Sequence, residues 1–239
     1  MKKTFFMGIV IGAVVFATAG CNTIVSGDVK GETSISIKKD EVKQLDVELN
    51  LPVGELMVSK GAEEWVEGSI EYNKKKLEPE VIYNSKGKKG EVIIEQGNLN
   101  NLNLSEIKNE WNLELSEDVP MNLSVNSGAS STELDLKGLK LEKLDVEAGV
   151  GELRIDLGGN WENSFETNIE TGVGPVTIIL PSEVGVKIKS EKGIGTSNVE
   201  GFISQGEGVY VNEAYEDADV ILTVNTEMGI GEITFKLDK

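Results

Sequence analysis

The stretch TGVGPVTIILP, residues 171–181, places two glycines one residue apart at the start of an apolar run. A Gly-x-Gly of this kind either binds a phosphate through successive backbone N–H groups or lets the chain turn sharply. Here Pro175, which has no N–H, follows at once, and neither a lysine nor a third glycine stands at the phosphate-loop spacing. The residues that follow alternate as in a strand. The pattern therefore predicts a structural corner.

The same corner recurs along the chain. Gly128, Gly149, Gly172 and Gly193 follow one another at intervals of 21, 23 and 21 residues, and Gly229 comes 36 residues later, which predicts an insertion before it. Two short strands around a fixed turn, repeated about every 22 residues, indicate the coils of a β-solenoid. We expect the glycines to adopt positive φ or to allow close stacking of corners, with the Val or Ile between them pointing inward. The predicted corner glycines are Gly128, Gly149, Gly151, Gly172, Gly174, Gly193, Gly195, Gly229 and Gly231.

The remaining segments predict strands as well. VKQLDVELNL (42–51) alternates, VIYNSKGKKGEVIIEQ (81–96) predicts a hairpin with its turn at 85–90, and NLNNLNLSEIKNEW (98–111) predicts a loop or a single helical turn. We expect an all-β protein, with a smaller β-rich region over residues 32–118 and a β-helix-like stack of short strands over residues 119–239. The polar coil 188–201 is expected where burial is least complete. A β-sandwich is the alternative, but the common phase of the glycines favours the solenoid.

The first residues, MKKTFFMGIVIGAVVFATAGC, predict a secretory signal: two lysines, an apolar core and small residues before Cys21. The apolar part is shorter than the roughly 20 residues that span a bilayer. The ending Gly-Cys resembles the lipobox of bacterial lipoproteins, which implies that the Cys21 thiol receives a diacylglyceryl group. We therefore predict a signal peptide at 1–20 and a lipidated tether at 21–31 that anchors the protein to the outside of the bacterial cell membrane. A plain signal peptide is the alternative.

The composition excludes several classes of function. The formal net charge is −18, or about −20 once residues 1–20 are removed, so the chain repels nucleic acid. It has no histidine and a single cysteine, which removes Ser-His and Cys-His nucleophile pairs and a zinc site of His and Cys ligands. We therefore predict a protein that is not an enzyme and has no cofactor and no metal.

Charged clusters offer few alternatives. The loop NEAYEDADV (212–220) is rich in acids but lacks calcium-loop spacing, so a solvated loop is predicted. Arg154, the only arginine, stands between Glu152 and Asp156 in a strand pattern that predicts a surface charge ladder. A calcium-dependent polysaccharide-active enzyme on a β-helix is the alternative function, and it would require Arg154. The lysines at 74–76 and at 86, 88 and 89 predict solvated turns.

The aromatic side chains allow two interpretations. They could form a platform on which sugars stack, or they could cap the ends of the solenoid and seal a junction between subdomains. The second arrangement is the more common. The aromatics concerned are Trp65, Trp111, Trp161 and Tyr210.

The segment from Trp111 to Leu157 resembles the toast-rack family. It contains a Trp, a Val-Pro-aliphatic step, a small-residue glycine turn, then Leu-Asp-Leu and a second glycine turn, and residues 51–72 and 79–96 are similar to the N-terminal toast-rack region. The resemblance implies a solenoid-like fold related to extracytoplasmic domains of envelope-stress and cell-wall-antibiotic response regulators and to adhesins. It implies no catalytic residues. We therefore expect a non-catalytic binding module for another envelope protein or a cell-wall component.

Overall fold

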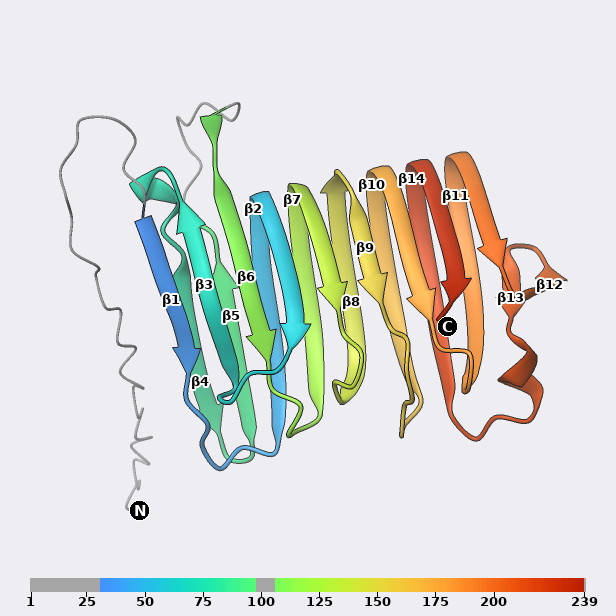
Figure 1. Cartoon of the computed structure of the whole chain (residues 1–239), viewed down its shortest axis with the longest axis horizontal. Coiled ribbons are helices and arrows are strands. Elements are labelled where there is room, and N and C mark those ends of the chain that lie inside the picture. The colour runs from blue at the N-terminus through green and yellow to red at the C-terminus, as the bar shows by residue number, and fades with distance from the viewer. Residues whose placement is uncertain (1–30, 98–105, 239) are drawn as a thin grey trace, which may run out of the picture.

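The computed structural model describes residues 31–97 and 106–238, which are built almost entirely of β-strands (Figure 1). The all-β prediction is confirmed. The predicted signal peptide, Cys21, most of the tether and the first part of the Asn-rich segment, residues 98–105, lie outside the described residues. Within the described ranges, the structure has no helix that is long and apolar enough to cross a bilayer.

The strands fall into two groups in chain order. The N-terminal group consists of β1 (Gly31–Ile37), β2 (Gln44–Lys60), β3 (Val66–Tyr72), β4 (Glu80–Lys86), β5 (Lys89–Glu95) and β6 (Asn109–Leu115), with the short 3-10 helix η1 (Lys75–Leu77). The C-terminal group consists of β7 (Met121–Asp135), β8 (Leu141–Val150), β9 (Leu153–Asp156), β10 (Phe165–Leu180), β11 (Gly185–Glu200), β12 (Ile203–Gly206), β13 (Val209–Val211), the 3-10 helix η3 (Glu213–Glu216) and β14 (Ile221–Leu237).

Bent strands form the body of the protein. β2, β7, β10, β11 and β14 are 15 to 17 residues long, and each bends near its middle into a U, while β8 and β9 supply the two legs of one further U (Figure 1). Neighbouring layers pair in parallel with the bends in register: Ala129 pairs with Val150, and Val150 with Val173. The predicted stack of glycine corners is therefore confirmed, with each layer open at the end opposite its bend.

The spatial order of the layers departs from the chain order at one point. β14, the last strand, lies between β10 and β11 and pairs with both over its whole length. The long interval before Gly229 contains the predicted insertion, which is the β12–β13 hairpin followed by η3. β11 is therefore the outermost U-shaped layer, although β10 precedes it directly in the chain.

The core runs through the inside of the Us. Alternating residues point inward from each leg, so Leu45, Val47, Leu49 and Leu51 of β2 are all 2% exposed or less. The second leg of each layer contributes a similar set, such as Ile178 of β10. In β11 the residues from 191 onward are exposed or only half-buried, which confirms the expectation of incomplete burial in this coil.

The N-terminal side of the stack is closed by antiparallel strands. β1, β3 and β6 pair in that order and join one leg of β2, and β5 joins the other leg. β4 and β5 form the predicted hairpin, with its turn at Gly87 and Lys88. The side chains of Trp65 and Trp111 are buried in this region, 3% and 1% exposed. Trp161 is 7% exposed and packs on Phe165, with ring centroids 4.7 Å apart. The three tryptophans therefore belong to the core, and a sugar-stacking platform built on them is excluded.

Asp238 ties the end of β14 to two loops. Its carboxylate accepts hydrogen bonds from the Gly159 N–H at 2.6 Å, the Ser182 N–H at 2.9 Å and the Ser182 hydroxyl at 2.8 Å. Burial raises the pKa of Asp238, but these hydrogen bonds outweigh it and hold the pKa below its ordinary value. A carboxyl whose pKa is lowered by folding stabilises the protein above its unfolded pKa of about 4 and loses that contribution as the pH falls through the folded pKa.

We expect Asp238→Asn to lower the free energy of unfolding by about 2 kcal/mol at pH 7, because the acceptor loses its charge and the Gly159 N–H would face an NH2 donor in place of its acceptor oxygen. The difference from the wild type should shrink as the pH falls below about 4. Urea unfolding between pH 7 and pH 3 measures both effects, with the exposed Asp219→Asn as the matched control. A difference that stays constant over this range would contradict the assignment.

Candidate functional site

The bends bring the backbones of neighbouring layers unusually close together. A Cβ atom added at Gly149, Gly172 or Gly229 would lie within 3 Å of the carbonyl oxygen of the preceding corner glycine in space, Gly128, Gly149 or Gly172 respectively. Real Cβ atoms essentially never come so close to another heavy atom. Gly193 meets Gly229 in the same way. The first glycine of each corner is therefore required by close approach between layers.

The second glycine of each corner is required by its own backbone conformation as well. Gly151, Gly174, Gly195 and Gly231 have φ between +138° and +154°, and a Cβ at any of them would also collide with the neighbouring layer. In β7, Ser130 occupies this position without a positive φ. The corner of β7 therefore turns with a different backbone conformation.

The structure has a sixth corner that the glycine repeat does not predict. Val53 and Gly54 of β2 pair in register with the corner of β7, and Gly54 has a φ of +142°. The repeat has a glycine at the first position, where this layer has Pro52. The signal was Gly54 at the second position, two residues after Pro52, within a strand of the right alternation.

The residue between the two glycines does not point inward, so that prediction is wrong. Val150, Val173, Ile230 and Ile194 are 58%, 45%, 49% and 72% exposed. The inside of the bend is already occupied by the residue before the first glycine, such as the buried Met228. The chain then turns, which leaves the middle side chain on the outer surface. Register places these four side chains in one row, called here the aliphatic row.

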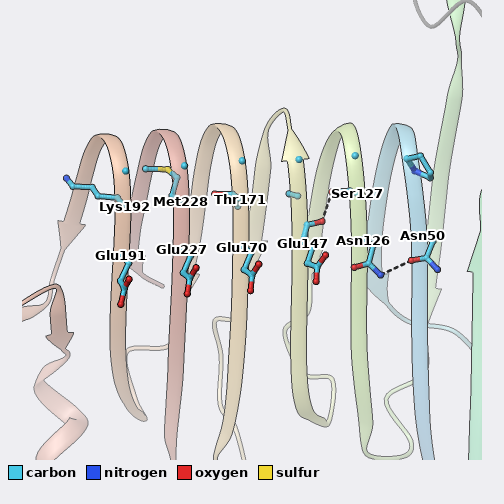
Figure 2. A pocket seen from close by; sticks show the side chains of 17 residues that line it. Asn50, Asn126, Ser127, Glu147, Glu170, Thr171, Glu191, Lys192, Glu227 and Met228 are labelled. Atoms are coloured by element: carbon cyan, nitrogen blue, oxygen red, sulfur yellow. Dashed lines mark hydrogen bonds between the residues drawn. The ribbon is translucent and has the colours of Figure 1, made fainter.

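A shallow groove of about 880 Å³ runs across the layers at the bends (Figure 2). The first corner glycines line it, together with the two residues before each of them. Because glycine has no side chain, the outer face of the stack is hollow along this line. The residues of the aliphatic row follow the lining glycines directly in each strand and are not themselves among the residues that line the groove.

A row of glutamates lines the groove. Glu147, Glu170, Glu227 and Glu191 pair in register on β8, β10, β14 and β11, and Figure 2 shows their side chains side by side. We call them the glutamate row. On β7 and β2 the row continues with Asn126 and Asn50, which are hydrogen-bonded to each other at 2.7 Å.

The glutamate row differs from the acids near Arg154 and Lys137. Those carboxylates are paired across layers: Glu133 lies 3.4 Å from Arg154, and Asp156 lies 3.1 Å from Lys137. By contrast, none of the four side chains of the glutamate row has a hydrogen-bond or ion-pair partner among residues 31–97 and 106–238. Like charges opposite each other on neighbouring strands repel. The row therefore keeps an uncompensated negative charge beside the groove.

The other sequence candidates lie elsewhere. Arg154 forms the predicted surface charge ladder with Glu133 of the neighbouring strand. The acidic loop 212–220 contains η3, and in the part of the chain that the structure describes no group of three or more acid or cysteine side chains is placed to hold a metal ion. Lys89 pairs with Asp46 at 2.6 Å. None of these residues lines the groove.

Comparison with known proteins fits this geometry. A family model described as the N-terminal domain of toast_rack, DUF2154, matches residues 25–179, well over half of the chain. The chain belongs to the toast-rack family. A second model, described as the C-terminal region of LiaF of the cell wall-active antibiotics response, matches residues 128–235 of this toast-rack protein. The predicted family resemblance is confirmed.

Solved structures include a similar chain. A protein described as "a putative cell adhesion protein" from Clostridium sporogenes ATCC 15579 is 36% identical, with a TM-score of 0.85 over 88% of this chain and 100% of that chain. An adhesin-like protein from Bacteroides fragilis NCTC 9343, described as "a putative adhesin", is 11% identical over 87% of this chain and 98% of that chain. Its TM-score of 0.32 is too low to support an argument. A comparison with curated proteins found no match.

Proposed function

We propose that this protein is a lipid-anchored, extracytoplasmic binding module that acts without catalysis and contacts another envelope protein or a cell-wall component through the groove at its bends. The observation that carries the proposal is a groove lined by the uncompensated glutamate row, with the exposed aliphatic row one residue beyond its glycines in each strand. A rigid parallel stack holds both rows at fixed spacing, as a binding surface requires.

Family membership supports an extracytoplasmic binding or sensing module. The match to the LiaF model favours a role in the envelope-stress response, whereas the description of the 36% identical structure favours surface adhesion. Both roles need a partner outside the membrane. They differ in whether occupancy of the groove changes when the cell wall is attacked.

Cross-linking in living cells tests the proposal. A photo-activatable residue at position 170 of the full chain lies at the groove, and one at position 183, which is exposed and does not line the groove, is the matched control. We expect a discrete cross-linked product from position 170 and none from position 183. A product that changes on treatment with a wall-active antibiotic supports sensing, and an unchanged one supports adhesion. Absence of a product from position 170 under both conditions would contradict the groove as a binding surface.

The lipid anchor has its own prediction. Cys21→Ser is expected to release the protein into the medium or to leave it as an unprocessed precursor, because the acyl chains that hold it would have no attachment point. Cell fractionation and the mass of the protein measure this. Thr18→Leu, which supplies the more usual lipobox residue, is the control and should leave anchoring intact. Unchanged membrane association of the serine variant would show that Cys21 is not lipidated.

A further inference from the structure

We propose that the groove binds a cationic amphipathic α-helix of a partner polypeptide, with basic side chains on the glutamate row and apolar side chains on the aliphatic row. This inference rests on the proposed function, because it names the chemistry of the partner for the same groove. It follows from the charge, the exposed apolar area, the spacing and the width of the site.

The negative charge of the glutamate row favours a partner that is positively charged. The four carboxylates of the glutamate row lie on consecutive layers, about 4.8 Å apart, and have no partner within residues 31–97 or 106–238. The cation that lines the groove is Lys192, at its outermost end. Repulsion along the row is relieved when cationic groups of a ligand lie against it. An anionic or neutral partner would leave the repulsion in place.

Exposed apolar area determines that the partner is amphipathic. Val150, Val173, Ile230 and Ile194 are each at least 45% exposed and lie on consecutive layers, so they form one continuous apolar strip. Isolated exposed aliphatic residues are common on protein surfaces, whereas a continuous strip with a polar border is typical of an interaction site. A purely polar cation would leave this strip in water.

Spacing favours a helix over an extended chain. On a helix that lies along the row, side chains three or four residues apart face the same way and recur about every 5.4 Å, close to the 4.8 Å between layers. Four basic residues at i, i+4, i+7 and i+11 therefore stay near four successive glutamates. In an extended strand, side chains on one face recur about every 6.7 Å, and such a ligand falls out of step by about 2 Å at each layer.

The width of the site fits the same ligand. The glutamate row and the aliphatic row are three residues apart along each strand, which is at most about 10 Å because the strand bends between them, and an α-helix with its side chains is about 10 to 12 Å across. The floor between them is formed by Gly149, Gly172, Gly229 and Gly193, over which a helix can approach closely.

The first experiment measures binding of a designed peptide of about 18 residues, roughly 27 Å long as a helix, with lysines at i, i+4, i+7 and i+11 beside a stripe of leucines. Calorimetry with the full chain at physiological salt measures the affinity for the peptide. Circular dichroism measures the helicity of the peptide. We expect binding with a gain in helicity. A scrambled peptide of the same composition should bind at least about tenfold more weakly, because it cannot address both rows at once. Equal binding of both peptides, or no binding, overturns the proposal.

Two sets of variants locate the site. Removing the charge of the glutamate row with the quadruple change Glu147→Gln, Glu170→Gln, Glu191→Gln and Glu227→Gln should weaken binding by at least about 30-fold. The control removes four exposed charges outside the groove, through Glu152→Gln, Glu162→Gln, Glu183→Gln and Glu213→Gln, and should change binding less than about threefold. Equal weakening by both sets would show attraction to the net charge alone and overturn the proposal.

The aliphatic row is tested separately with Val173→Ser and Ile230→Ser, which should weaken the helical peptide by at least about tenfold and leave the scrambled peptide unaffected. The matched control is Met57→Ser with Ile203→Ser, two side chains that are 49% and 52% exposed outside the groove. An effect no larger than that of the control overturns the proposal. If position 170 cross-links to a partner in cells but the peptide does not bind, this inference fails while the proposed function stands.

Discussion

Gly174→Ala is expected to lower the free energy of unfolding by more than about 3 kcal/mol. The added Cβ would collide with the carbonyl oxygen of Gly151 in the neighbouring layer, and the backbone at Gly174 has a φ of +143° that alanine rarely adopts. Collision with a backbone atom and strain at positive φ each cost about 1–3 kcal/mol. Relief would require the two layers to separate, and β10 pairs with its neighbours on both sides. Urea unfolding followed by circular dichroism measures the loss.

Gly159→Ala is the matched control. Gly159 also has a positive φ, +86°, but nothing lies within 4 Å of an added Cβ. Gly159→Ala should therefore lower the free energy of unfolding only through backbone strain at positive φ, by about 1 kcal/mol. If the two variants were equally destabilised, close approach between layers would not be the reason for the corner glycines.

The stack could be predicted from the sequence because its cause lies in single residues. At the first corner position of every layer from β7 onward, a Cβ would strike the carbonyl of the neighbouring layer, so these glycines recur with the period of the layers. The first layer differs. At the outer end of the row of bends, Pro52 has no earlier corner against it, so the position tolerates proline and the glycine repeat does not extend to it.

The candidate site was harder to predict, for two physical reasons. Val173 and its equivalents are apolar, and alternation with buried residues suggested an inward direction, but the bend is too tight to hold them inside. The glutamate row depends on which layers are neighbours. Glu227 lies between Glu170 and Glu191 in space, although it follows both in the chain. Without the position of β14, the four acids do not form one row.

The position of β14 follows from burial rather than from the repeat. β11 and β14 have glycine corners in the same phase, so pairing alone permits either order. Their inward residues differ: β14 has Met228, Ile233 and Phe235, all 4% exposed or less, where β11 has Lys192, Ser197 and Val199. The apolar layer gains more from two neighbours, and the polar layer loses less at the edge. The sequence predicts incomplete burial of the coil 188–201. It does not predict that this coil takes the edge position while the last strand, β14, lies inside it.

Phe235→Ala is expected to lower the free energy of unfolding by about 3–5 kcal/mol, because it empties a fully buried position inside the stack. Phe235 pairs in register with Ile178 of β10 on one side and with Val199 of β11 on the other. Loosening it should therefore reduce amide hydrogen-exchange protection in both β10 and β11. Urea unfolding measures the first effect, and hydrogen exchange resolved by peptide measures the second.

Phe202→Ala is the matched control, since Phe202 is half-buried in the segment that follows the outermost layer. The same change there should cost about 1 kcal/mol and leave protection of β10 unaltered, because the cavity opens to solvent and β14 still separates the site from β10. If the layers followed the chain order, β14 would lie at the edge and would not contact β10. Phe235→Ala would then leave the amide protection of β10 unaltered, as the control does. Loss of protection on both sides of β14 thus tests the strand order on which the continuity of the glutamate row depends.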